Sequence, residues 1–424
     1  MSRYLLAKIL NKTRNDKFLI NSLILLCGSL AVGVTNYLYE FLMARMLTIV
    51  EYGELQSLLA ILTIIAIPTA ILSTVLVKYA ADFKAKNRPN KIYSLFLLLT
   101  KKTAIIAIIS FAIFFIFCRQ IADFLNLDSV WPLLILGIVF IFSFPGSINL
   151  GILRGLQKFK ELSAVSLISA VLKVIFSIWL VKLGFAVNGA IGAITLAGVA
   201  GYIISFYPLK FLFKWDKEAV RMKEIWYYFF PVGFSLLFIA LLCSVDIILV
   251  KHFFSAQTAG EFGALTMLGN MIFFMTGPIA GVMFPMSVDA RSSLSNPAKI
   301  LKKAIFLTGL IGLGIVSFYF IAPEPIIKIL IGNKFLIIGE YLGWFGLAMF
   351  QYSLVVLLAN YFLSVEKAKG AYLVGLGSLL QIVFIYIFHD NLWQIVWIMN
   401  GSMLFVLCLL IFYFIKIYYL CPEK

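Results

Sequence analysis

Residues 51–70, EYGELQSLLAILTIIAIPTA, return in recognisable form as residues 261–280, EFGALTMLGNMIFFMTGPIA. In each copy a Glu-aromatic-Gly triplet is followed, fifteen residues after its glycine, by a proline, Pro68 in the first and Pro278 in the second. The glycines of the two triplets are 210 residues apart. The segments LKVIF at 172–176 and LQIVF at 380–384 are 208 residues apart. Glu40 and Arg45 match Asp246 and Lys251, each 206 residues later. Three matches at nearly one offset indicate an internal duplication.

The composition excludes a soluble globular protein. Of the 424 residues, 62% are hydrophobic and 13% are charged, whereas soluble domains have about 45–50% apolar and 25% charged residues. A soluble fold would leave large apolar patches on its surface, so lipid is the expected solvent. The net charge of +16 would suggest nucleic acid in a soluble protein. Here the basic residues lie in short segments between apolar runs, and we expect no nucleic-acid partner.

Apolar runs of the length that spans a bilayer, roughly 20 residues, occur about twelve times. The segment 91–102, KIYSLFLLLTKK, is read as an amphipathic extension of the third run that lies at the membrane surface. The expected spans are 18–41, 55–77, 103–120, 131–151, 162–182, 187–209, 226–250, 261–285, 304–322, 337–362, 370–388 and 393–416.

The basic residues alternate between the two sides of these spans. Of the 35 Lys and Arg residues, 28 lie in the two tails and in every second connection, six lie in the opposite connections, and Lys173 lies within a span. Because cytoplasmic loops carry the excess of Lys and Arg, both termini are predicted to be cytoplasmic. The sequence therefore predicts a multi-pass protein of the cytoplasmic (inner) membrane with an even number of spans.

The repeat converts the helix count into an architecture. An offset of about 208 residues covers six helices, and an even number preserves orientation, so the halves are parallel repeats about an axis along the membrane normal. The predicted fold is all-α, with two six-helix bundles around a central cavity. The expected parts are a cytoplasmic tail at 1–17, an N-lobe at 18–209, an inter-lobe linker at 210–225, a C-lobe at 226–418 and a cytoplasmic tail at 419–424.

Three segments carry a family resemblance: ARMLTIVEYGELQSLLAI at 44–61, GILRGLQKFKELS at 151–163 and VDIILVKHFFSAQTAGEFGAL at 245–265. They resemble the Wzx-type polysaccharide-biosynthesis flippases of the multidrug/oligosaccharidyl-lipid/polysaccharide (MOP) exporter superfamily. The resemblance covers the whole chain and implies a MATE/MOP-like fold that alternates between inward- and outward-open states. It also implies transport of an undecaprenyl-pyrophosphate-type lipid-linked oligosaccharide to the outer leaflet, as for O-antigen. A polysaccharide polymerase and a chain-length regulator would then be candidate partners.

Lys173 is the sharpest candidate for substrate binding. It lies near the middle of the fifth span, where a lysine costs a few kcal/mol unless it faces water or a partner. We expect it to be a cavity cation for phosphate or an acidic sugar; a structural pair or a snorkelling lysine is the alternative. Its repeat mate Gln381 offers a neutral hydrogen-bonding group or, alternatively, packs helices together.

Four charges suggest a gate. Glu40 precedes Arg45 by five residues, and Asp246 precedes Lys251 by five, a spacing that does not favour pairing within one helix. We therefore expect pairs between the lobes, Glu40 with Lys251 and Asp246 with Arg45, that close the outer side. Interfacial charges that face lipid headgroups are the alternative.

Four further residues are candidates for the cavity. Arg154 and Arg291 lie on the predicted cytoplasmic side, where they either capture pyrophosphate or only satisfy the positive-inside rule. Asn36 and Asn270 either hydrogen-bond sugar hydroxyls or bond a neighbouring helix.

No cofactor or metal site is expected. The two His residues are far apart, and the five Cys residues include no CxxC pair. Proton or sodium coupling remains open, with Asp246 and Glu40 as the acids that would carry it. The sequence has no Walker A, HExxH or G-x-S-x-G motif, so a transporter is favoured over an enzyme such as a membrane glycosyltransferase. An ion-coupled multidrug exporter of the same superfamily is the alternative function, and it would need buried carboxylates.

Overall fold

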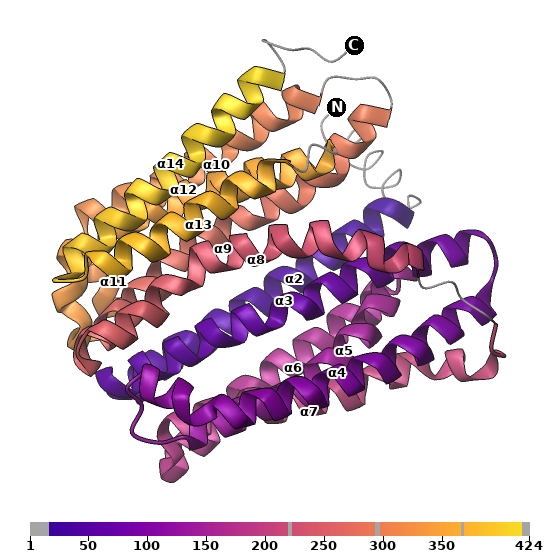
Figure 1. Ribbon diagram of the computed structural model, residues 1–424, viewed down its shortest axis with the longest axis horizontal. Coiled ribbons are helices and arrows are strands. Elements are labelled where there is room, and N and C mark those ends of the chain that lie inside the picture. The colour runs from indigo at the N-terminus through magenta and orange to yellow at the C-terminus, as the bar shows by residue number, and fades with distance from the viewer. Residues whose placement is uncertain (1–16, 219–222, 293–296, 366–368, 418–424) are drawn as a thin grey trace, which may run out of the picture. The chain divides into compact units, whose positions relative to one another are not determined.

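The computed structural model describes residues 17–218, 223–292, 297–365 and 369–417 (Figure 1). The predicted tails at 1–17 and 419–424 therefore lie almost entirely outside the described residues, as does part of the linker at 210–225. Among the described residues every regular element is a helix.

Twelve of the helices have 19 or more residues, which matches the number of predicted spans. These long helices are α2 (Lys17–Met46), α3 (Ile49–Ala85), α4 (Pro89–Phe124), α5 (Trp131–Gly155), α6 (Phe159–Leu180), α7 (Ala186–Ser205), α8 (Lys223–Phe253), α9 (Ala256–Ser292), α10 (Pro297–Ile321), α12 (Gly339–Ser364), α13 (Lys369–Ile387) and α14 (Leu392–Ile415).

Four short helical elements complete the described chain: η1 (Val181–Phe185), η2 (Tyr207–Lys214), α11 (Pro323–Leu330) and η3 (Asn333–Ile338). The π-helical turn η1 joins α6 to α7, and the chain reverses at Gly184, whose φ of 90° suits a residue without a Cβ. The sequence did not predict α11 and η3, because both are too short to show as apolar runs.

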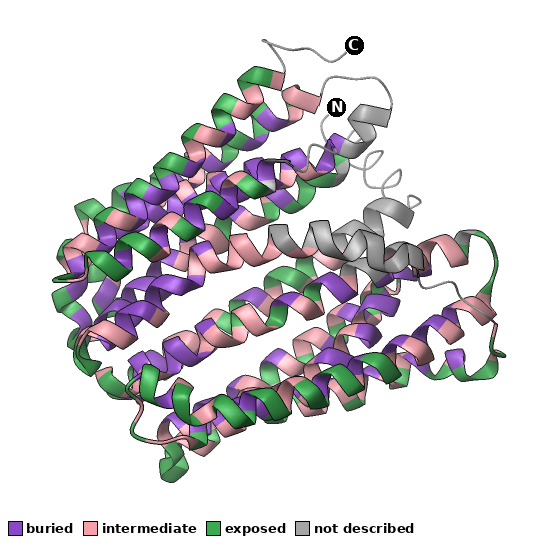
Figure 2. Cartoon of the chain, in the orientation of Figure 1, coloured by how far each residue is buried: buried purple, intermediate pink, exposed green. Residues whose placement is uncertain are grey.

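Most of the long helices are apolar enough for a membrane. Nine segments of the described chain meet the length and apolarity of a span, and one of them, at 159–205, contains both α6 and α7. The apolar part of α13, Tyr372–Ile387, is shorter. Large apolar side chains of α4, including Ile108 and Ile116, are more than half exposed (Figure 2). Such a surface fits contact with lipid.

The first part of α4 is an amphipathic extension of the third span, as predicted, and its place at the membrane surface stays a prediction. Residues 91–102 are continuous with the rest of a 36-residue helix. Ile92, Leu95, Phe96 and Leu99 recur at helical spacing and are buried, because they form one apolar face that packs inside the protein.

The chain forms two compact units. Unit 1 contains residues 1–42, 68–120 and 129–229, and unit 2 contains residues 43–67, 121–128 and 230–424. In unit 1, α7 packs against α5 and α6; in unit 2, α12 packs against α9, α10 and α14. This division differs from the expected boundaries at 209 and 226, because the start of α3 packs within unit 2.

The repeated triplets meet in unit 2, where the start of α3 crosses the start of α9. A Cβ atom on Gly53 would lie 2.6 Å from the backbone N of Gly260, and one on Gly260 would lie 2.0 Å from the carbonyl O of Ile49. A Cβ on Gly263 would lie 3.8 Å from the Cα of its repeat mate Gly53. Only glycine permits so close an approach of two backbones. The motif that reveals the repeat is therefore a helix-crossing motif.

Candidate functional site

Lys173 on α6 lies against α2 in unit 1. Its Nζ donates a hydrogen bond to Oδ1 of Asn36 at 2.8 Å and lies 4.3 Å from the centre of the Tyr39 ring. Tyr39 is fully buried, and its hydroxyl donates to the carbonyl O of Ala190 on α7 at 3.3 Å. The structure thus brings together two predicted substrate-binding residues, Lys173 and Asn36, and adds a tyrosine that the sequence argument missed.

The spacing of residues on α2 explains this cluster. Asn36, Tyr39 and Glu40 are separated by three and four residues, so they share one helix face. Glu40 interacts electrostatically with Lys173. Tyr39 could have been predicted from the segment NYLYE at 36–40. It lies three positions after Asn36 and next to Glu40, on the same face of the helix.

The cluster suits the binding of an anion. The Lys173 ammonium has three N–H donors, and Asn36 accepts a hydrogen bond from one of them. Lys173 is half-buried, where the lower dielectric strengthens an interaction with a phosphate above its value in water. Lys173 lies fourteen residues after the start of α6 at Phe159, about 21 Å along the helix, so it is deep within the span.

The repeat places a neutral pair at the equivalent position of unit 2. Gln381 on α13 is fully buried; its Nε2 donates to the carbonyl O of Leu242 on α8 at 3.4 Å, and its Oε1 accepts from Ser402 at 3.1 Å. The offsets of 206 and 208 residues relate Leu242 to Asn36 and Gln381 to Lys173. These contacts account for Gln381 as a helix-packing residue, and the cationic cluster belongs to the first half.

We expect Gln381→Leu to lower stability without altering transport. The change removes two buried hydrogen bonds, and interhelical bonds of this kind contribute about 0.6 kcal/mol each on average. Thermal unfolding in detergent and the transport rate should be measured on the same preparation. Loss of transport with an unchanged unfolding temperature would instead assign Gln381 to substrate binding.

Asp246 on α8 is a buried acid in unit 2. It is 1% exposed, and neither carboxylate oxygen has a hydrogen-bond partner among the described residues. One turn earlier, the Sγ of Cys243 donates to Oδ1 of Asn270 on α9 at 3.7 Å. The sequence placed Asp246 at the outer boundary; α8 instead continues seven residues further, to Phe253, about 10 Å at 1.5 Å per residue. Burial excludes a carboxylate that simply faces headgroups.

Asp246 does not pair with Arg45, although both lie in unit 2. Arg45 Nη2 donates instead to the carbonyl O of Ile329 at the end of α11. In the same way, Lys334 Nζ donates to the carbonyl O of Leu47, just after α2. The two cations satisfy carbonyls that helix ends leave unpaired. The expected pair is thus absent from this structure, because α11 and η3, which the sequence did not predict, supply other partners.

Lys251 is 1% exposed, and its Nζ has no hydrogen-bond partner among the described residues. It interacts electrostatically with Glu54 and Asp128, which the sequence argument did not consider. The proposed pair of Lys251 with Glu40 joins residues of different units and stays a prediction.

Of the two candidate arginines, only Arg154 has a described side chain. Arg154 lies in the last turn of α5 and is exposed. Arg291 lies near the end of α9, and its side chain is outside the described set. Across the described residues, no group of three or more His, Cys, Asp or Glu side chains could hold a metal ion.

Comparison with known proteins identifies the family. The model of the family described as "Polysaccharide biosynthesis protein" matches residues 42–339. A search of curated proteins finds no significant match. The family match covers 298 residues, more than half of the chain, so the resemblance to polysaccharide-biosynthesis proteins noted in the sequence is confirmed.

Solved structures of MOP superfamily proteins share the fold. An inward-facing multidrug resistance MATE family transporter of this superfamily superposes with a TM-score of 0.77 at 14% identity, covering 90% of this chain and 94% of its own. The lipid II flippase MurJ, in an inward closed conformation, gives 0.72 at 14% identity, with coverage of 92% and 87%. A MOP superfamily transporter from Pyrococcus furiosus gives 0.60 at 16% identity, with coverage of 94% and 93%. The chain therefore belongs to the polysaccharide biosynthesis protein family, has the fold that these MOP superfamily structures share, and carries the apolar helices of a multi-pass membrane protein.

Proposed function

We propose that this transporter moves a polyprenyl-pyrophosphate-linked oligosaccharide from the inner to the outer leaflet of the cytoplasmic membrane by alternating access. The observation that carries the proposal is the Lys173 cluster. A lysine deep in a span, held by Asn36 and the Tyr39 ring, provides a cation where a lipid-linked pyrophosphate needs one during its passage. Both termini face the cytoplasm in this proposal, in agreement with the distribution of Lys and Arg.

Deletion of the gene in its own cells tests this function. Cells without the transporter should accumulate lipid-linked oligosaccharide that an external, membrane-impermeant glycosidase cannot reach. Restoring the wild-type gene should expose the sugar again. An intermediate that remains fully accessible from outside in the deletion strain would contradict the proposal.

We further propose that the transport is coupled to protons or sodium at Asp246. An ionised carboxylate without a partner is costly in the interior, so Asp246 needs a proton or a cation when it is buried. Cys243 interacts electrostatically with Asp246 and donates to Oδ1 of Asn270, and such an amide oxygen is a suitable hard ligand.

We expect Asp246→Asn to remove the dependence of transport on an ion gradient. In proteoliposomes, transport by the wild type should slow when the driving proton or sodium gradient is dissipated. Transport by the variant should have the same rate with and without the gradient. Asp390→Asn is the matched control, because Asp390 is an exposed acid of the same unit. A variant that responds to the gradients as the wild type does would rule out Asp246 as the coupling site.

One observation favours the alternative of an ion-coupled multidrug exporter. A buried carboxylate is what a cationic drug would require, and Asp246 is buried. The same proteoliposomes should therefore be offered a lipophilic cationic dye. We expect no gradient-driven accumulation of the dye, because the half-buried cation Lys173 opposes cationic substrates.

A further inference from the structure

A pocket of about 390 Å³ lies in unit 1, where three connections between helices meet. The turn from α3 to α4 contributes Lys84 and Arg88, the turn from α5 to α6 contributes Lys158, and the end of η2 with the following residue contributes Phe211 and Trp215. The volume is in the range of small-ligand sites, about 300–1,000 Å³. These connections belong to the set that is rich in Lys and Arg and that the sequence predicts to be cytoplasmic.

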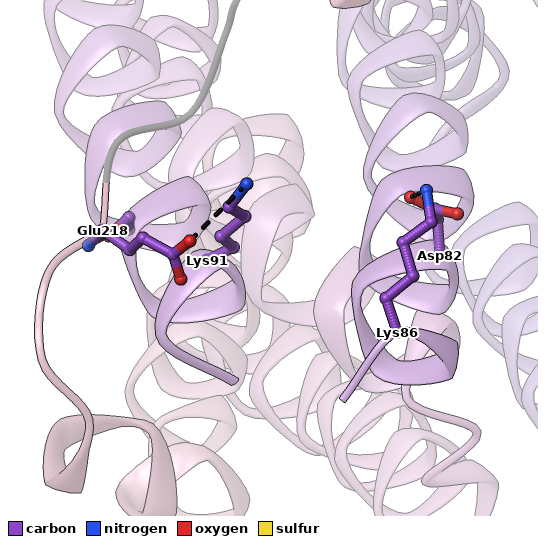
Figure 3. Close-up of polar contacts among 5 residues, drawn as sticks. Asp82, Lys86, Lys91 and Glu218 are labelled. Atoms are coloured by element: carbon purple, nitrogen blue, oxygen red, sulfur yellow. Dashed lines mark hydrogen bonds and ion pairs between the residues drawn. The ribbon is translucent and has the colours of Figure 1, made fainter. Parts of the chain in front are cut away.

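The charge lining this pocket is uncompensated. Three cations line it, and none of its described lining residues is acidic. Two nearby acids are already paired: Asp82 with Lys86 at 2.8 Å and Glu218 with Lys91 at 3.5 Å (Figure 3). Three cations around one concave space repel one another, so the pocket favours an anion.

Specific contacts hold the walls in place. Lys84 Nζ donates to the carbonyl O of Leu156 at 2.8 Å, which ties the first turn to the second. Lys158 Nζ lies 3.6 Å from the centre of the Phe211 ring, which ties the second turn to η2. The backbone N of Glu218 donates to Oγ of Ser94 at 2.6 Å, which fixes the segment after Trp215 to α4. Lys84 and Lys158 are therefore positioned before any ligand arrives.

The element η2, beside the pocket, has the composition of a segment at the level of lipid headgroups. Leu209 and Leu212 are buried, whereas Tyr207 and Phe213 are 74% and 52% exposed. A short amphipathic element with exposed aromatic rings is typical of the membrane interface. Ile92 and Trp215 add apolar and aromatic surface beside the cations.

We propose that this pocket binds the phosphate of an anionic phospholipid headgroup of the surrounding leaflet. Arg88 and Lys158 would bond the phosphate oxygens, while Trp215 would contact the apolar part of the lipid next to the headgroup. Basic pockets between membrane helices bind anionic headgroups in this manner. The pyrophosphate of a lipid-linked sugar, or phosphate free in solution, has the same chemistry, and the experiment separates these sources.

The test is native mass spectrometry of the full chain, purified in detergent and titrated with phosphatidylglycerol or phosphatidylcholine. The double variant Arg88→Gln, Lys158→Gln removes two lining charges. Lys86→Gln is the matched control, because Lys86 lies in the same turn, pairs with Asp82 and does not line the pocket. Lys84 is left intact, since it also ties two turns together.

The wild type should retain phosphatidylglycerol in preference to phosphatidylcholine. The double variant should bind phosphatidylglycerol roughly thirty-fold more weakly. Each of the two basic residues contributes about 1 kcal/mol near an anionic lipid surface, and about 1.4 kcal/mol is a tenfold change in affinity. Lys86→Gln should stay within about twofold of the wild type, because surface ion pairs contribute little. All three proteins should share one unfolding temperature, which separates lost binding from misfolding.

Two results would overturn the proposal. One is equal retention of phosphatidylglycerol by the wild type and the double variant. The other is weak, unselective lipid binding together with tight binding of inorganic pyrophosphate that depends on Arg88 and Lys158; this result would assign the pocket to a soluble or substrate phosphate. Neither result bears on whether lipid-linked oligosaccharide crosses the membrane.

Discussion

Replacing Lys173 with alanine is expected to slow flipping of a pyrophosphate-linked substrate by about ten- to a hundredfold. A hydrogen bond to a charged group contributes about 1.5–3 kcal/mol, and each 1.4 kcal/mol is a tenfold change. The Nζ of Lys173 is the group at this depth of unit 1 that is positioned by both Asn36 and Tyr39. The measurement is the initial rate of flipping in proteoliposomes that contain equal amounts of folded protein.

Lys182→Ala is the control for this experiment. Lys182 lies in the turn η1 that follows the same helix, and it is exposed. Lys182→Ala therefore removes the same charge as Lys173→Ala but leaves the Lys173 cluster intact. Lys173→Arg should retain part of the rate, since it keeps the charge but changes its geometry. An unchanged rate in Lys173→Ala, with Lys182→Ala equally unchanged, would show that Lys173 only packs α6 against α2.

Replacing Gly260 with alanine is expected to destabilise the protein strongly. The new Cβ would lie 2.0 Å from the carbonyl O of Ile49, a backbone atom that cannot turn aside. Overpacking of this kind costs about 1–3 kcal/mol, which exceeds the gain of about 0.5–1 kcal/mol from replacing glycine in a helix. Thermal unfolding followed by tryptophan fluorescence should show a clear fall in midpoint.

Gly281→Ala on the same helix separates crowding from helix propensity. No heavy atom lies within 4 Å of the position that its Cβ would take, so the midpoint should stay constant or rise. If Gly260→Ala proved as stable as Gly281→Ala, the start of α3 would not pack against the start of α9 as the structure shows.

Much of the fold follows from the sequence because lipid imposes simple rules on the chain. A span needs a long apolar run, and all twelve long helices correspond to predicted runs. Part of the repeat has a structural cause, since the close helix crossing tolerates no other residue at Gly53, the glycine of the first triplet. The short elements α11 and η3 gave no such signal, since eight or fewer residues cannot form a recognisable run.

The site was harder to predict because it depends on which helices become neighbours. Lys173 stood out by its depth, and its pairing with Asn36 required α6 to lie on α2. Arg45 was expected to pair with an acid, yet it donates to a carbonyl of α11, an element absent from the predicted map. Asp246 was judged shallow because residue counting gave its depth along the helix but not its burial by neighbours.

The central claim is transport of an anionic lipid-linked sugar, and reconstitution tests it most directly. The purified protein would be placed in vesicles that carry a fluorescent polyprenyl-pyrophosphate oligosaccharide, with protein-free vesicles as the reference. We predict that the protein accelerates exchange of this lipid between leaflets, measured by quenching with an impermeant reagent, and does not concentrate a cationic dye. Exchange no faster than in protein-free vesicles, together with gradient-driven dye accumulation, would contradict the account.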